Sequence, residues 1–190
     1  MLAIGGVLQW FRTSGKSKAL IEAVRSEPDK EKRNALKQTI HAVVFGSEPQ
    51  TERKASACKQ NGVLCLDFDH IPADTLESAK KTIAAVPYVF AVGLSVSGNG
   101  FFALAAYEGT PDLKTLLVAM QADFSYEIDK QCSDISRLRF VTYDPDIIIQ
   151  DSVTPAVLTE RTEPAESESA ELESSQCGAT ILKNVSKNSL

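Results

Sequence analysis

The residues best suited to chemistry are two aspartates, Asp67 and Asp69, which follow the apolar run 63–66. An apolar run of this length without helical spacing is typical of a buried strand. Because side chains alternate between the faces of a strand, both carboxylates are expected to project from one face, close together. Two such carboxylates repel unless a cation lies between them, and Mg²⁺ or Mn²⁺ favours carboxylate and phosphate oxygens. The alternative is a pair of solvated aspartates where the strand meets a loop.

Two further segments could complete such a site. Residues 97–100 supply a tight turn with positive φ, between a predicted strand over 88–96 and a predicted return strand over 101–107. Asp129 stands ahead of Arg137 and of a last predicted strand, residues 138–143. Each segment alone also has a structural reading, because a glycine-containing hairpin is usually only a turn.

In this order and with these gaps, the three segments resemble the archaeo-eukaryotic primase superfamily, the primase-polymerases, and within it the VirE N-terminal-like branch. The first motif of that branch, a strand-borne Asp-x-Asp with a following histidine, is matched by residues 67–70. The serine-glycine hairpin of the second motif is matched by residues 95–100. The third motif, a hydrophobic residue plus Asp ahead of an Arg-Leu strand, is matched by residues 128–129 and 137–140. The resemblance extends over about residues 18–147.

The resemblance implies a compact α/β (α+β) fold with a recognition-motif-like mixed or antiparallel sheet flanked by helices. It implies a DNA primase-like nucleotidyltransferase in the replication of a bacterial, phage or mobile element. The expected partners are single-stranded DNA template and nucleoside triphosphates, with a separate helicase as a further candidate and no membrane. Two divalent ions, Mg²⁺ or Mn²⁺, would clamp the attacking oxygen and the leaving phosphate.

The resemblance also implies a role for each matched residue. Carboxylates would hold the metals, while cations and backbone amides would hold the triphosphate. The catalytic and metal-binding residues are Asp67, Asp69 and Asp129, and the nucleotide-binding residues are Ser95, Ser97, Gly98, Asn99, Gly100, Arg137 and Arg139.

One position departs from the family pattern. Active members of many branches place a phosphate-binding histidine shortly after the hairpin, where this chain has Phe101 and Phe102. A second hypothesis is therefore a catalytically inactive module that binds nucleic acid or nucleotide for a partner helicase. A third is a metal-dependent phosphohydrolase, which would need a water-activating base from His41 or His70. The sequence contains no P-loop that would supply ATPase activity.

Basic residues are concentrated in the first third of the chain, although the net charge is −5. A predicted helix over residues 29–39 and a long polar loop over 47–62 carry them, and long loops are often functional. Because phosphate contacts by such residues release counterions, they could guide a nucleic-acid backbone. The alternative is an ordinary solvated face. The candidate residues are Arg33, Lys37, Arg53, Lys54 and Lys59.

Periodicity and breaker residues predict the remaining elements. The expected elements are a strand over residues 4–12, a helix from Lys16 to Pro28, a strand over 41–46, a helix capped by Asp74 and ending before Pro87, and a helix opened by residues 110–112.

Composition predicts one domain, residues 1–150, because 43% of the chain is apolar. Residues 151–190 are rich in Glu and Ser and are expected to form a disordered tail or linker stub that buries no core. The four cysteines have no zinc-like spacing and are interpreted as free thiols. No apolar window is long enough for a membrane span, so we expect a cytoplasmic protein.

Overall fold

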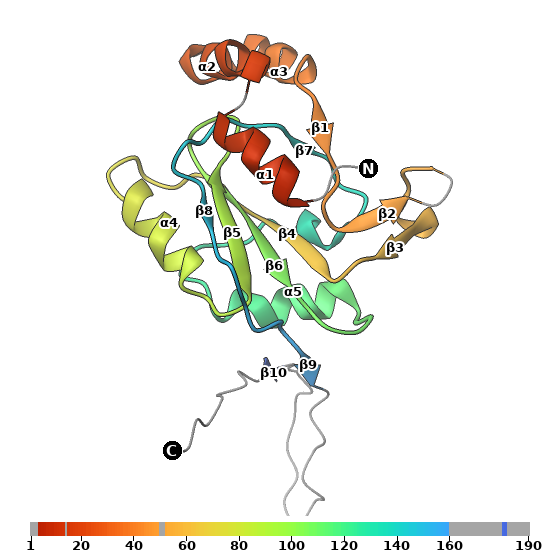
Figure 1. Ribbon diagram of the computed structural model, residues 1–190. Coiled ribbons are helices and arrows are strands. Elements are labelled where there is room, and N and C mark those ends of the chain that lie inside the picture. Colours follow the sequence, from red (N-terminus) through yellow and green to blue (C-terminus); the bar gives the residue numbers. More distant parts are fainter. Residues whose placement is uncertain (1–3, 14, 50–51, 160–179, 182–190) are drawn as a thin grey trace, which may run out of the picture.

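The computed structural model describes residues 4–13, 15–49, 52–159 and 180–181 (Figure 1). In this part of the chain the helices are α1 (Ile4–Thr13), α2 (Lys18–Ser26), α3 (Lys30–Gln38), α4 (Leu76–Ala84) and α5 (Leu113–Gln121), with short 3₁₀ helices at Gly15–Ser17, Ala55–Ala57 and Lys130–Ser133. The strands are β1 (Ala42–Val43), β2 (Ser47–Pro49), β3 (Cys58–Gln60), β4 (Val63–Phe68), β5 (Val89–Leu94), β6 (Phe101–Ala106), β7 (Arg139–Phe140), β8 (Ile148–Ile149), β9 (Leu158–Thr159) and β10 (Thr180–Ile181).

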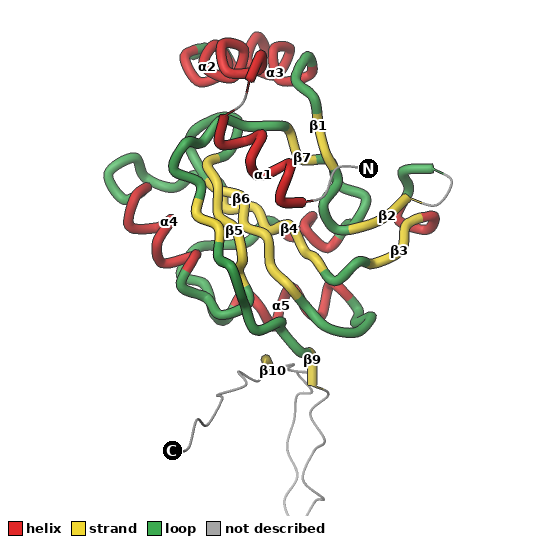
Figure 2. Tube along the Cα trace, viewed as in Figure 1, coloured by secondary structure: helices red, strands yellow, loops and turns green. Residues whose placement is uncertain are grey.

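A four-stranded antiparallel sheet in the order β4-β6-β5-β8 forms the centre of the fold, and helices lie around it (Figure 2). The predicted α+β class with an antiparallel sheet is therefore confirmed. Smaller pairs join β1 to β7, β2 to β3 and β9 to β10. Within the described residues, no helix combines the length and apolar character needed to cross a membrane.

Strand alternation divides the core into two layers. Leu64, Leu66 and Phe68 of β4 face one layer, where they pack in a buried cluster with residues of α4 and α5. Phe102 of β6 faces the other layer together with Phe11 of α1. The predicted DFD strand and the hairpin of β5 and β6 are both confirmed.

The strand predicted over residues 4–12 is wrong, because this segment forms helix α1. Its buried residues are Val7, Leu8 and Phe11, whose spacing places them on one helix face. The Phe11 ring makes edge contacts with the rings of Phe45 and Phe102. A short apolar run does not distinguish a strand from a buried helix, and here packing on the sheet decides for the helix.

The polar loop predicted over residues 47–62 is also corrected, because it contains the hairpin of β2 and β3. Backbone pairing makes this segment regular although its sequence has no apolar alternation. The hydroxyl of Ser47 is buried and donates to the carbonyl of Ile135 at 2.8 Å, which attaches the hairpin to the segment before β7. The strands predicted over 41–46 and 138–143 are shorter than expected, and they pair with each other as β1 and β7.

Helix α3 begins after Asp29 and α5 begins after Asp112, and each aspartate accepts a hydrogen bond from a backbone amide of its first turn. The predicted cap of α4 at Asp74 is wrong. Thr75 occupies the cap position, and its hydroxyl instead donates to the carbonyl of Pro72. The sequence did predict the helices α2, α3, α4 and α5 themselves, and α1 is the exception.

Packing continues past the predicted domain boundary at residue 150. Ala156 is buried in the cluster that contains residues of α4 and α5, and partly buried Leu158 packs against the same cluster. The amide of Ala156 donates to the carbonyl of Ala106 at 2.9 Å. The expectation that nothing after residue 150 contributes to a core is therefore wrong for this stretch, while 160–179 and 182–190 lie outside the described residues.

Candidate functional site

The three segments singled out in the sequence meet at one cavity of about 200 Å³. It lies on the sheet face that Asp67 shares with Cys65, opposite the layer built on Leu66. Strand β4, the turn after β5 and the segment around β7 contribute its walls, together with one residue of α3. The lining residues are Lys37, Asp67, Asp69, Ser95, Val96, Ser97, Arg137, Leu138, Arg139 and Phe140.

The turn after β5 lies directly against the end of β4. A Cβ at Gly100 would lie 2.2 Å from the carbonyl oxygen of Phe68, so only glycine permits this approach. The amide of Ile71 donates to the carbonyl of Asn99 at 3.1 Å, just beyond the aspartates. Gly98 has a φ of 77°, as the predicted turn requires. The hairpin glycines thus bring the second segment next to the first.

Asp67 is held by arginines from the third segment. Its Oδ1 accepts a hydrogen bond from Nη1 of Arg139 at 2.6 Å, and its Oδ2 contacts Nη2 of the same arginine. The side chains of Asp67 and Arg139 are only 7% and 14% exposed. Nη2 of Arg137 lies 3.4 Å from Asp67 Oδ2. Burial, the largest effect, lowers the pKa of Arg139, but the pKa is raised above its ordinary value in the folded state, and the charge and hydrogen bond of Asp67 contribute to this increase.

Asp129 lies beside β4, because its amide donates to the carbonyl of Asp67 at 3.0 Å. Ile128 is buried in the core. The Asp129 carboxylate accepts from Nη2 of Arg137 at 2.8 Å and from the amide of Gln131 at 2.9 Å. Burial raises the pKa of Asp129, but these two hydrogen bonds outweigh it, so the pKa is lowered. Arg137 therefore bridges the carboxylates of Asp67 and Asp129.

Asp134, the neighbouring acid, serves a turn. Its Oδ1 accepts from the amide of Ser136 at 2.8 Å and from the Ser136 hydroxyl at 2.7 Å. This is ordinary turn chemistry for an aspartate, so Asp134 ranks below Asp129 as a candidate for the site.

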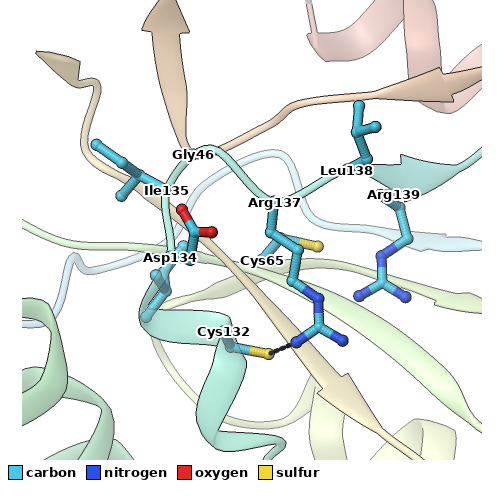
Figure 3. Close-up of a pocket in the computed structure, with 9 residues that line it drawn as sticks. Gly46, Cys65, Cys132, Asp134, Ile135, Arg137, Leu138 and Arg139 are labelled. Carbon is cyan, nitrogen blue, oxygen red and sulfur yellow. Dashed lines mark hydrogen bonds between the residues drawn. The ribbon is translucent and has the colours of Figure 1, made fainter. Parts of the chain in front are cut away.

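Two thiols lie behind the arginines in a small adjoining cavity (Figure 3). Nη1 of Arg137 lies 3.9 Å from the sulfur of Cys132. Burial raises the pKa of Cys132 to about 12 and also raises the pKa of Cys65, so both are neutral thiols. Cys58, Cys65 and Cys132 are free, as predicted, and Cys177 lies outside the described residues. The sequence analysis did not identify these thiols as neighbours of the site, although Cys65 stands two residues before Asp67 and shares its face.

The predicted nucleic-acid contacts are spread over a wider area. Lys37 lines the cavity. The pKa of Lys37 is lowered, first by burial and then by the charge of Arg33, although Asp69 and Asp67 act in the opposite direction. Arg53 donates to the carbonyl of Ser136, the residue before Arg137, at 3.0 Å. The others lie farther along the surface: Arg33 donates to the carbonyl of Glu27, Lys54 pairs with Glu52, and Lys59 is exposed on β3.

The donor set fits a divalent ion in part. Asp67 and Asp69 both line the cavity, and their oxygens are the type that Mg²⁺ or Mn²⁺ binds. The carboxylate of Asp129 is directed to Arg137, and within the described residues no three His, Cys, Asp or Glu side chains gather around one point. The residues therefore suit one ion that also binds ligand oxygens, and the role of Asp129 as a metal ligand stays a prediction.

Two buried polar atoms at this cavity have no hydrogen-bond partner, Ser95 Oγ and Arg139 Nε. Leaving a buried polar group unpaired costs about 1–3 kcal/mol, and such groups mark places where a ligand can bind. The ring of Phe102, at the position expected for histidine, is fully buried beside Phe45. Neither His41 nor His70 lines the cavity.

Comparisons with curated proteins and with solved structures found no match. A scan against protein families matched residues 31–148 to the family described as "BT4734-like, N-terminal domain". The matched region is more than half of the chain and contains every residue that lines the cavity. The chain therefore belongs to the BT4734-like, N-terminal domain family.

Proposed function

We propose that this chain is a metal-dependent nucleotidyltransferase of the primase-polymerase type, which joins nucleotides into a new strand on a single-stranded DNA template. One observation carries the proposal. Asp67 and Asp69, residues 95–97 and residues 137–139 are separated along the chain but line the same cavity, which supports the proposal. The resemblance to the VirE N-terminal-like branch of primase-polymerases supplies the reaction class.

The cavity offers groups that suit a triphosphate. Arg137 is 29% exposed and shared between two carboxylates, so it can exchange one of them for a phosphate oxygen. Lys37 approaches from α3, and the hydroxyl of Ser95 is an unused donor. Backbone amides of the turn at residues 97–100 are further donors for an anion.

Asp67 and Asp69 are the residues that would hold Mg²⁺ or Mn²⁺. A divalent ion bound there would stabilise the charge that develops on the transferred phosphate and activate the attacking oxygen. The hydrogen bond from Arg139 fixes the Asp67 carboxylate on the cavity wall, while exposed Asp69 supplies the adjustable ligand.

The test is primer synthesis on single-stranded DNA with nucleoside triphosphates and Mn²⁺, comparing wild type with Asp69→Asn. Asp69 is the right target because it is exposed, so its loss should abolish synthesis without unfolding the domain. Asp74→Asn, which changes another exposed aspartate of the following loop, is the matched control and should leave synthesis unchanged. Synthesis that survives in Asp69→Asn would contradict the proposed metal site.

The second candidate function is a catalytically inactive module that binds nucleotide or single-stranded DNA for a partner helicase. Two observations favour it: Phe102 is buried at the position expected for histidine, and arginines neutralise both Asp67 and Asp129. Such a module would bind nucleoside triphosphate or single-stranded DNA in the same cavity, with an affinity that falls steeply with salt, and would synthesise nothing.

A further inference from the structure

Arg25 on α2 reaches from its helix to two segments beside the cavity. Its Nη2 donates to the carbonyl of Ser95 at 3.1 Å, to the carbonyl of Tyr143 at 2.8 Å and to the hydroxyl of Thr142 at 3.2 Å. One guanidinium nitrogen thus joins α2, the start of the turn after β5, and the segment that follows β7. Arg25 was not among the residues suggested by sequence motifs.

The stem of Arg25 also packs against the turn itself. A Cβ added at Gly98 would lie 3.2 Å from the Arg25 side chain, so this glycine leaves just enough room for the arginine. The amide of Gly98 donates to the carbonyl of Ser95 at 3.0 Å. The Ser95 carbonyl therefore accepts from both Gly98 and Arg25, and the arginine closes the turn from outside.

The charged guanidinium of Arg25 donates its hydrogen bonds to neutral groups. Its hydrogen-bond acceptors are two carbonyls and one hydroxyl, and its Nε is buried without a partner. Burial is the largest effect on the pKa of Arg25 and lowers it, which shows that the guanidinium is partly removed from water. An arginine used only for surface solubility would not be buried in this way.

The cavity depends on the segments that Arg25 joins. Ser95 and Ser97 line it directly, and Thr142 follows two residues after the end of β7, the strand that carries Arg139. The hydroxyl of Thr142 also donates to the carbonyl of Leu94 at 2.8 Å, next to the Arg25 contact. Movement of the turn would displace the Ser95 hydroxyl and the amides of residues 97–100 from the cavity wall.

We propose that Arg25 is a positioning residue of the cavity, which holds the turn of residues 95–100 in the shape that receives the phosphates of a nucleotide. This inference rests on the proposed function and assigns part of the specificity of the site to α2. Since α2 precedes the matched region 31–148, a fragment limited to that region would lack this support.

The test compares Arg25→Met, Arg25→Lys and the control Arg12→Met in the full chain. Arg12 is a suitable control because its Nη2 also donates to a backbone carbonyl, that of Ile147 at 3.1 Å, but neither residue lines the cavity. Two quantities are measured at a temperature where every variant is folded. They are the hydrogen-exchange rate of the Gly98 amide and the affinity for a nucleoside triphosphate with Mn²⁺.

We expect Arg25→Met to speed exchange at Gly98 and to weaken nucleotide affinity about tenfold, because a preorganised turn becomes mobile. Arg25→Lys should restore part of both properties, while Arg12→Met should change neither. If Arg25→Met or Arg25→Lys lowers the melting temperature but leaves Gly98 exchange and affinity as in Arg12→Met, the proposal is overturned. If wild type binds no nucleoside triphosphate, the proposed function fails, and Gly98 exchange alone still decides whether Arg25 holds the turn.

Discussion

The side chains of the six residues of β4 alternate between two faces of the sheet, and the two faces lie in different environments. On one face, Leu64, Leu66 and Phe68 are almost fully buried among apolar side chains. On the other face, Asp67 is almost equally buried but lies against charged groups from β7 and its neighbourhood. Burial alone is enough to stabilise the first face, whereas the second is stable only if specific partners arrive at hydrogen-bond distance.

This difference separates the strand into a part that any apolar residue of suitable volume could fill and a part that depends on pairing. Cores tolerate volume-conserving apolar exchanges, but a buried charge without its partner is strongly destabilising. The proposed site uses this second face. A substitution of buried Asp67 should therefore affect both stability and function, whereas a substitution of exposed Asp69 should affect function alone.

The largest effect is expected for Asp67→Asn, which leaves the buried guanidinium of Arg139 without its anion. The free energy of unfolding should fall by about 3–5 kcal/mol in urea titrations. The double variant Asp67→Asn with Arg139→Met removes both charges and should recover much of this loss. A loss for the single variant no larger than that of an exposed control, Asp74→Asn, would contradict the burial of this pair.

On the apolar face, Leu66→Ala should lower the free energy of unfolding by about 3 kcal/mol through lost burial and a cavity. Because Leu66 points away from the site, the affinity of the folded fraction for nucleoside triphosphate should be unchanged. Isothermal titration calorimetry at low temperature measures this affinity for Leu66→Ala and for wild type. A large change in affinity would show that the two faces are coupled through β4.

A third test concerns Phe102, which stands at the position where the family pattern has a histidine. Phe102 lies opposite Asp67 in the β4–β6 pair, but its ring packs beside Phe11 and Phe45. Phe102→His should therefore cost about 2 kcal/mol of stability, because a polar ring is buried without a partner, and it should not increase synthesis. Phe102→Leu is the apolar control. Increased synthesis in Phe102→His would mean that this side chain reaches the ligand.

A smaller effect is expected at Asp134, whose carboxylate accepts from the amide and the hydroxyl of Ser136 in its own turn. Asp134→Asn should lower the free energy of unfolding by about 1 kcal/mol and leave nucleotide transfer intact, whereas Asp129→Asn should abolish any transfer. Assaying both variants side by side tests the choice of acid. An inactive Asp134→Asn beside an active Asp129→Asn would reverse the assignment.

The smallest effect is the pH dependence at Asp129. Its pKa is lowered in the folded state, so its stabilising effect is fully present above the ordinary value of 3.8 and is lost as the pH falls through the lowered value. The stability difference between wild type and Asp129→Asn should therefore shrink as the solution is acidified below pH 3.8. Thermal unfolding followed by circular dichroism measures it, and a difference that does not change with pH would contradict the Arg137 pairing.

The elements that carry strong local signals were predictable from sequence. The apolar run before Asp67 and the glycine turn after β5 specify a strand and a hairpin through alternation and backbone freedom, which act over a few residues. The segment 4–13 was assigned wrongly, because its apolar residues fit a strand or a helix and only packing against the sheet decides. The β2–β3 hairpin was missed because its polar sequence has no period, and its pairing depends on hydrogen bonds to the segment before β7.

For the site, the sequence alone determined that Asp67 and Asp69 share a face, since strand geometry follows from alternation, and the family resemblance grouped them with the hairpin and with Asp129. Only the tertiary structure decided that Asp67 is paired with Arg139, 72 residues later, and that Arg137 bridges to Asp129. It also brought Lys37 and Arg25 to the site from helices without any motif. The physical reason is that a charge pair or a hydrogen bond depends on distance in space, which local periodicity does not encode.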